Sequence, residues 1–130
     1  MNPLRRRGGF TLVEIMIVAG VISLLAAIAV PGFMRARKRT QATRILEDLR
    51  LIDAAISQYA VETNKVAGSH PVFSDLQPYL KKGSPLYNTS RNVLGHRYRN
   101  FTVDSLPRVP NRSMTALSDV ADTAFWSPYQ

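Results

Sequence analysis

Hydrophobic residues are concentrated in one continuous run near the N-terminus. Between Phe10 and Val30 the only ionisable side chain is Glu14, whereas polar residues are frequent throughout the rest of the chain. A membrane-spanning helix needs about 20 apolar residues. The pattern therefore predicts a helix over residues 10–30 that is able to cross a bilayer.

After Pro31 the apolar residues recur at helical spacing. The intervals alternate between four and three positions, which places these residues on one face of a helix. The stripe consists of Ile45, Leu49, Ile52, Ile56 and Tyr59. We expect an amphipathic continuation of the helix over residues 31–65 that ends near Asn64, before a segment with glycine and proline.

Residues 66–130 contain shorter signals and form the predicted globular head. Capping-box spacing that begins at Ser74 predicts a short helix over residues 75–82, and residues 86–87 and 98–103 resemble short strands. The predicted fold class is α+β: one long helix, its lower half in the membrane and its upper half packed on a small antiparallel sheet. Three aromatic residues are expected to pin the tail onto the long helix: Phe125, Trp126 and Tyr129.

Composition excludes several kinds of chemistry. The 130 residues include no cysteine, so disulfides, thiol catalysis and cysteine-ligated metals are excluded. The chain also lacks a histidine–carboxylate motif, a nucleophile elbow and a glycine-rich phosphate loop. We therefore expect that the protein is not an enzyme.

The formal charge is +8, and much of the excess lies beside the apolar run. Arg5 to Arg7 precede the run, and four basic residues between Arg35 and Arg39 follow it, where they would meet lipid headgroups. Because both flanks are basic, charge alone does not choose the orientation in the membrane.

Five arginines in the head suggest a surface for nucleic acid. They are Arg91, Arg97, Arg99, Arg108 and Arg112, with Tyr98 and Phe101 among them. A basic surface with interleaved aromatic residues is typical of DNA-binding proteins. Scattered arginines more often form a solvated face, so the sequence weighs against nucleic acid as a partner.

The start of the apolar run resembles the prepilin signature shared by type IV pilins and the pseudopilins of type II secretion. Basic residues precede Gly9, Phe10 follows it, and Glu14 is the fifth residue from Phe10 in a long apolar segment. The resemblance implies a leader over residues 1–9, cleavage by a prepilin peptidase between Gly9 and Phe10, and methylation of the new amino group. An ordinary signal peptide cut after Ala29 is the alternative, but its apolar region would be shorter and free of carboxylates.

Glu14 has two interpretations. An ionised carboxylate is expensive inside a bilayer, and near the end of the span its side chain could extend to the membrane surface. The resemblance implies instead that Glu14 pairs with the amino group of Phe10 in another subunit during assembly. Gly20 and Pro31 also match positions that the family uses in assembly, where each would weaken or bend the helix.

A metal site in the head has only weak candidates. Many major pseudopilins bind calcium, and the resemblance directs attention to Asp119 and Asp122, which could supply carboxylate oxygens. No calcium-binding loop pattern surrounds them. We expect solvated loop aspartates and no cofactor, with calcium as the alternative.

Assembly is the function that the resemblance implies. The chain would be a pseudopilin of type II secretion, anchored in the inner membrane by one span, with its N-terminus cytoplasmic and its head periplasmic. Its partners would be the prepilin peptidase, copies of itself or related minor pilins or pseudopilins, the inner-membrane assembly platform and membrane lipid. A minor type IV pilin whose head binds DNA during uptake is the alternative.

Overall fold

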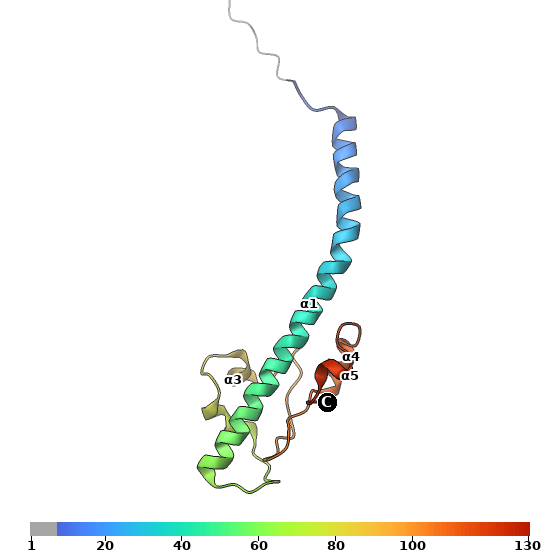
Figure 1. Ribbon diagram of the computed structural model, residues 1–130. Helices are drawn as coiled ribbons and strands as arrows, with labels where there is room; N and C mark the ends of the chain where they lie inside the picture. Colours follow the sequence, from blue (N-terminus) through green and yellow to red (C-terminus); the bar gives the residue numbers. More distant parts are fainter. Residues whose placement is uncertain (1–7) are drawn as a thin grey trace, which may run out of the picture. The chain divides into compact units, whose positions relative to one another are not determined.

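The computed structural model describes residues 8–130, so Arg5 to Arg7 of the predicted leader lie outside the described residues. The chain divides into two compact units, Met1–Arg35 and Ala36–Gln130. Figure 1 shows the elements, which follow in chain order: α1 (Leu12–Thr63), α2 (Phe73–Leu76), η1 (Gln77–Tyr79), α3 (Pro85–Thr89), α4 (Asn111–Ala116) and α5 (Thr123–Trp126).

The predicted long helix is confirmed as α1, which has 52 residues. It continues through Pro31 and ends at Thr63, beside the predicted end at Asn64. Asn64 adopts a left-handed conformation with φ 49°, and the N–H of Lys65 donates to the carbonyl of Ala60 at 3.1 Å. This is the bond of a Schellman motif, which satisfies a carbonyl that the end of the helix would leave unpaired.

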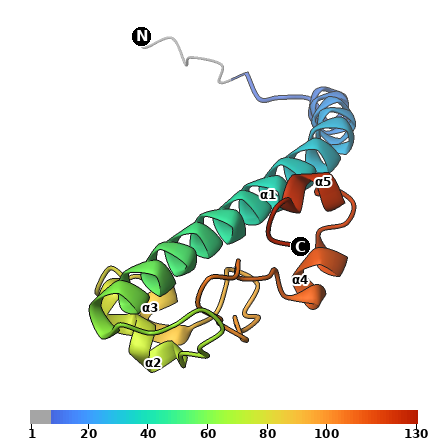
Figure 2. The same cartoon turned by 60° about the horizontal axis from the view of Figure 1, so that its bottom comes forward.

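The apolar stripe of α1 organises the core of the unit Ala36–Gln130. Ile45, Leu49, Ile52 and Ile56 are buried as predicted, and Tyr59 is half-buried. The segments that follow α1 lie along this part of the helix in both views (Figures 1 and 2). They contribute the other large buried side chains: Leu76, Leu80, Leu86, Tyr98, Phe101, Val103, Val109, Leu117, Trp126 and Tyr129.

The predicted antiparallel sheet is wrong. Residues 8–130 contain no strand, only an isolated antiparallel bridge between Arg91 and Arg97. Residues 86–87 belong to helix α3 because Pro85 favours the first helical position and the Ser84 Oγ accepts the N–H of Tyr87 at 3.1 Å. The described head is therefore built from short helices and turns instead of an α+β sheet.

The second predicted strand fails because its backbone turns. Asn100 lies at φ 60° and Asp104 at φ 64°, conformations that interrupt an extended strand. Val103 instead exchanges hydrogen bonds with the segment after α1: its N–H donates to the carbonyl of Ser69, and its carbonyl accepts from Gly68. These bonds satisfy the buried backbone locally without a ladder.

The predicted helix over residues 75–82 begins earlier and ends earlier. Its first turn is α2, where the N–H of Val72 donates to Asp75 Oδ2 at 3.0 Å, so the cap precedes Ser74. The chain then tightens into η1, which contains Pro78 and ends at Tyr79. Proline lacks the N–H that an α-helix would need at this point.

The C-terminal tail packs on the core as predicted. Trp126 is 1% exposed and Tyr129 is buried, in the same core cluster as the stripe of α1. The carbonyl of Tyr129 also accepts the N–H of Val109 at 2.8 Å. Phe125 is half-buried, and the guanidinium of Arg39 on α1 lies 5.9 Å from its ring centre, within the range of a cation–π contact.

Two leucines on α1 test whether burial of the apolar stripe stabilises the folded head. Leu49 is fully buried, whereas Leu51 is 54% exposed. We expect Leu49→Ala to lower the free energy of unfolding by about 2 to 5 kcal/mol, because it leaves a cavity. Leu51→Ala, the matched control, should change it by less than about 0.5 kcal/mol. Urea titration of the detergent-solubilised monomer, followed by the fluorescence of Trp126, measures both; equal losses would contradict this packing.

Candidate functional site

The N-terminus of α1 carries a reciprocal capping box. Glu14 Oε2 accepts the N–H of Thr11 at 2.8 Å, and Thr11 Oγ1 accepts the N–H of Glu14 at 3.2 Å. Two backbone donors that a helix start leaves unpaired are thereby satisfied. The carboxylate also lies at the positive end of the helix dipole, where a negative charge is stabilising.

Sequence reasoning missed this role of Glu14, although its signal is present. A threonine followed three residues later by a glutamate, just before an apolar run, is the capping-box pattern. The structure therefore adds a third interpretation to the two considered for Glu14. Its carboxylate has a local partner at the first turn of α1.

The apolar run forms a helical surface that the described chain leaves uncovered. Phe10 is 86% exposed and Ile28 is 72% exposed, and none of the apolar window of α1 is buried. Among the described residues, α1 is the one helix that is long and apolar enough to cross a membrane. A continuous apolar surface of this size normally lies against lipid or another protein.

The residues of the predicted processing site are accessible. Gly9 and Phe10 are exposed and precede the first helical residue, Leu12. Gly20 and Pro31 lie within α1, and both are exposed. A Cβ added at Gly20 would meet nothing within 4 Å, so packing inside the described chain does not require a glycine there.

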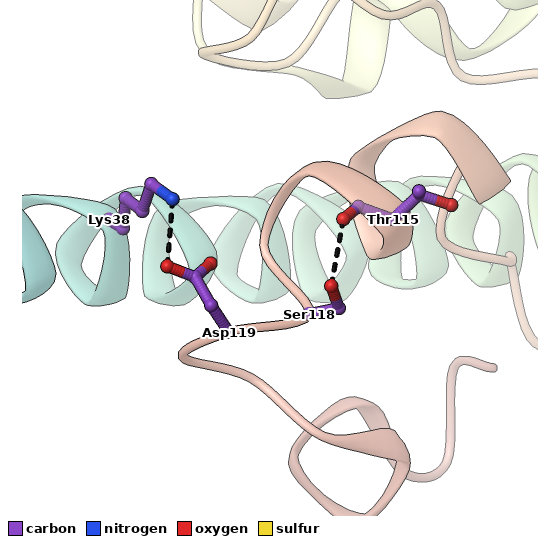
Figure 3. A network of polar contacts seen from close by, with 4 residues as sticks. All are labelled: Lys38, Thr115, Ser118 and Asp119. Carbon is purple, nitrogen blue, oxygen red and sulfur yellow. Dashed lines mark hydrogen bonds and ion pairs between the residues drawn. The ribbon is translucent and has the colours of Figure 1, made fainter.

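The two aspartates proposed as weak metal ligands have structural contacts. Asp119 Oδ2 lies 2.7 Å from Lys38 Nζ on α1, and the pair is drawn in Figure 3 beside the hydrogen bond from Ser118 to the carbonyl of Thr115. Asp122 Oδ1 accepts the N–H of Phe125 at 2.8 Å and caps α5. Within residues 8–130, no three histidine, aspartate or glutamate side chains gather where they could hold a metal.

A polar contact joins α1 to the segment of the head that follows α3. The Tyr98 hydroxyl donates to Asp48 Oδ2 at 3.0 Å. Burial raises the pKa of Asp48, the hydrogen bond from Tyr98 opposes this, and the charge of Glu47 adds to it. Burial and the neighbouring Asp48 raise the pKa of Tyr98 far above its ordinary value. This pair therefore makes the stability of the core depend on pH.

Comparison with known proteins identifies a motif at the N-terminus. The family described as "Prokaryotic N-terminal methylation motif" matches residues 4–30. The match covers the basic leader, Gly9, Phe10 and Glu14, together with the apolar run that forms the first part of α1. No solved structure matches the chain.

Curated relatives are pilins and secretion proteins. The chain is 35% identical over 66 residues to a fimbrial protein of Pseudomonas aeruginosa, an alignment that covers 51% of the chain and 43% of the relative. It is 39% identical over 67 residues to the type IV major alpha-pilin of Moraxella bovis (52% and 39%). With the type II secretion system core protein G of Aeromonas hydrophila the identity is 30% over 61 residues (47% and 43%).

These findings confirm the resemblance drawn from the sequence. The chain carries the prokaryotic N-terminal methylation motif and is similar to type IV pilins and to a type II secretion system core protein over about half of its length. The aligned part spans less than half the length of these relatives.

Asp48 predicts a pH dependence of stability. The pKa of Asp48 is higher in the folded state than in the unfolded chain. Its contribution to the free energy of unfolding is therefore fully present below the ordinary carboxyl pKa, and it is lost as the pH rises through the raised pKa. We expect Asp48→Asn to gain stability relative to the wild type as pH increases from about 3 to about 7. Urea titrations across this range measure the difference; a constant difference would contradict it.

Proposed function

We propose that this protein is a structural subunit of a type IV pilus-like filament and that it is a pseudopilin of type II secretion. The observation that carries the proposal is an uncovered apolar helix whose first part lies within a methylation motif. A helix satisfies its own backbone hydrogen bonds, so the same surface is compatible with lipid and with the packed core of a filament. During assembly this apolar surface would move from lipid into the packed core of the filament.

Maturation is the first step of the proposed pathway. A prepilin peptidase cuts between Gly9 and Phe10 and methylates the amino group of Phe10. Both residues are exposed and lie outside the helix, as an accessible cleavage site requires. The mature chain stays in the inner membrane by α1, with its head in the periplasm, until the assembly platform adds it to copies of itself or to related subunits.

Glu14 then has two tasks in the mature chain. Cleavage leaves the N–H of Thr11 intact, so the capping box persists and keeps the first turn helical. The same carboxylate carries the charge that pairs with the amino group of Phe10 in a neighbouring subunit. Desolvation offsets much of such an ion pair, so its main effect is to select one stagger among many apolar packings.

A secretion pseudopilus is favoured over a pilus by one observation. The chain has no cysteine, and many pilins close their head with a disulfide whereas many major pseudopilins do not. The relatives include both pilins and a type II secretion core protein, so they fit either kind of filament. In this role Gly20 and Pro31 would let part of α1 adjust when the subunit enters the filament.

The mass of the mature protein tests the processing. We expect the intact protein, purified from the membranes of its own cell, to have lost residues 1–9 and gained one methyl group. Tandem mass spectrometry should place the methyl group on the amino nitrogen of Phe10. A retained leader, or a chain that begins after Ala29, would overturn the proposal.

Two variants separate the charge of Glu14 from its cap. Glu14→Gln keeps an oxygen that accepts the N–H of Thr11 but removes the charge, and Thr11→Val removes the hydroxyl acceptor but keeps the charge. We expect normal cleavage of both by mass, loss of filaments for Glu14→Gln, and retained filaments for Thr11→Val, which costs about 1 kcal/mol of helix capping. Wild-type filament numbers for Glu14→Gln, counted by electron microscopy, would exclude the pairing role.

A further inference from the structure

The structure gathers five arginines of the head around two adjoining hollows. One, of about 430 Å³, is lined by Arg91, Arg97, Arg99 and Arg112. The other is lined by Arg97, Arg99 and Arg108, so the two hollows share a wall that also includes Pro110 and Asn111. We call the two together the arginine cleft.

Among the described residues, no carboxylate lines the arginine cleft. The chain after Lys65 has seven basic residues and four aspartates, and five of the seven basic residues but none of the aspartates lie there. All five guanidinium side chains are on exposed residues, and Arg91 Nη1 donates to the carbonyl of Gly95 at 2.7 Å. Such a concentration of one charge sign in a concave surface focuses an attractive potential for anions.

A buried polar group holds the cleft in shape. The Asn92 side chain donates to Ser113 Oγ at 2.7 Å and accepts the N–H groups of Leu94 and His96 at 3.0 Å. His96 Nδ1 shares a second hydrogen bond with Ser113 Oγ at 2.8 Å. Ser113 is fully buried on α4, so these bonds fasten the turn between Arg91 and Arg97 to the helix that carries Arg112.

The aromatic residues between the arginines, Tyr98 and Phe101, do not line the arginine cleft. Tyr98 is 4% exposed and Phe101 is 6% exposed, so both belong to the core. Base stacking on aromatic rings is therefore not the chemistry of this cleft. Guanidinium groups, in contrast, donate paired hydrogen bonds that match the oxygens of a phosphate.

We propose that the arginine cleft binds the phosphodiester backbone of duplex nucleic acid without reading its sequence. Two hollows in succession suit a chain of regularly spaced anions better than a single small anion, and a surface whose Lys, Arg, Asp and Glu residues are all arginines suits phosphate oxygens. The proposal does not depend on filament assembly, because the cleft lies within the unit Ala36–Gln130. The sequence alone favoured a solvated face for these arginines, whereas the proposal assigns them to a binding site.

Fluorescence anisotropy of the full-length, detergent-solubilised protein with a labelled random-sequence duplex tests this site. The variant is Arg97→Gln/Arg99→Gln, and the charge-matched control is Lys81→Gln/Lys82→Gln, which removes two exposed charges outside the cleft. Titrations between about 50 and about 200 mM salt give the number of phosphate contacts, since each contributes about −0.9 to the slope of log K against log salt. Trp126 fluorescence checks that each variant is folded.

We expect the cleft variant to bind at least about tenfold more weakly and its salt slope to become shallower by about 2, one for each lost phosphate contact. The control should bind like the wild type. Equal losses in the two variants would reduce the effect to general charge attraction and overturn the proposal. Equally tight binding of polyglutamate with the same charge would also overturn it, in favour of an acidic protein partner.

Discussion

The uncovered apolar surface of the first part of α1 is the constraint on which the other features depend. Side chains such as Phe10 and Ile28 remain exposed within the described chain, so their burial must come from lipid or from another protein. A helix is the form in which such a segment can enter either environment, because its backbone needs no outside partner. The Thr11–Glu14 capping box completes this arrangement where the helix begins.

The second part of α1 differs from the first, because its apolar stripe is covered by other residues of the same chain. The described helices of the head have three to six residues, too short to be stable alone. They persist because Leu76, Leu86, Leu117 and Trp126 bury their side chains in one cluster with the stripe. The head therefore depends on α1 as its scaffold.

Polar contacts add to the apolar packing and fix the loops of the head. The Asn92, His96 and Ser113 group fastens the turn that carries two arginines, and the Tyr98–Asp48 hydrogen bond joins this region to α1. Buried polar groups are stable only when they are satisfied, so such contacts specify one arrangement of the loops. The same network that shapes the head leaves the guanidinium groups exposed to solvent.

The sequence by itself determined α1, the stripe and the N-terminal motif, because these rest on composition and on helical spacing along a continuous segment. It also contained the capping box, which pattern reasoning overlooked. Only the tertiary structure decided that residues 86–87 are helical, that residues 98–103 form no strand and that five arginines share one cleft. Short apolar runs fit a strand or a turn equally well, and distant arginines meet only when the core brings their loops together.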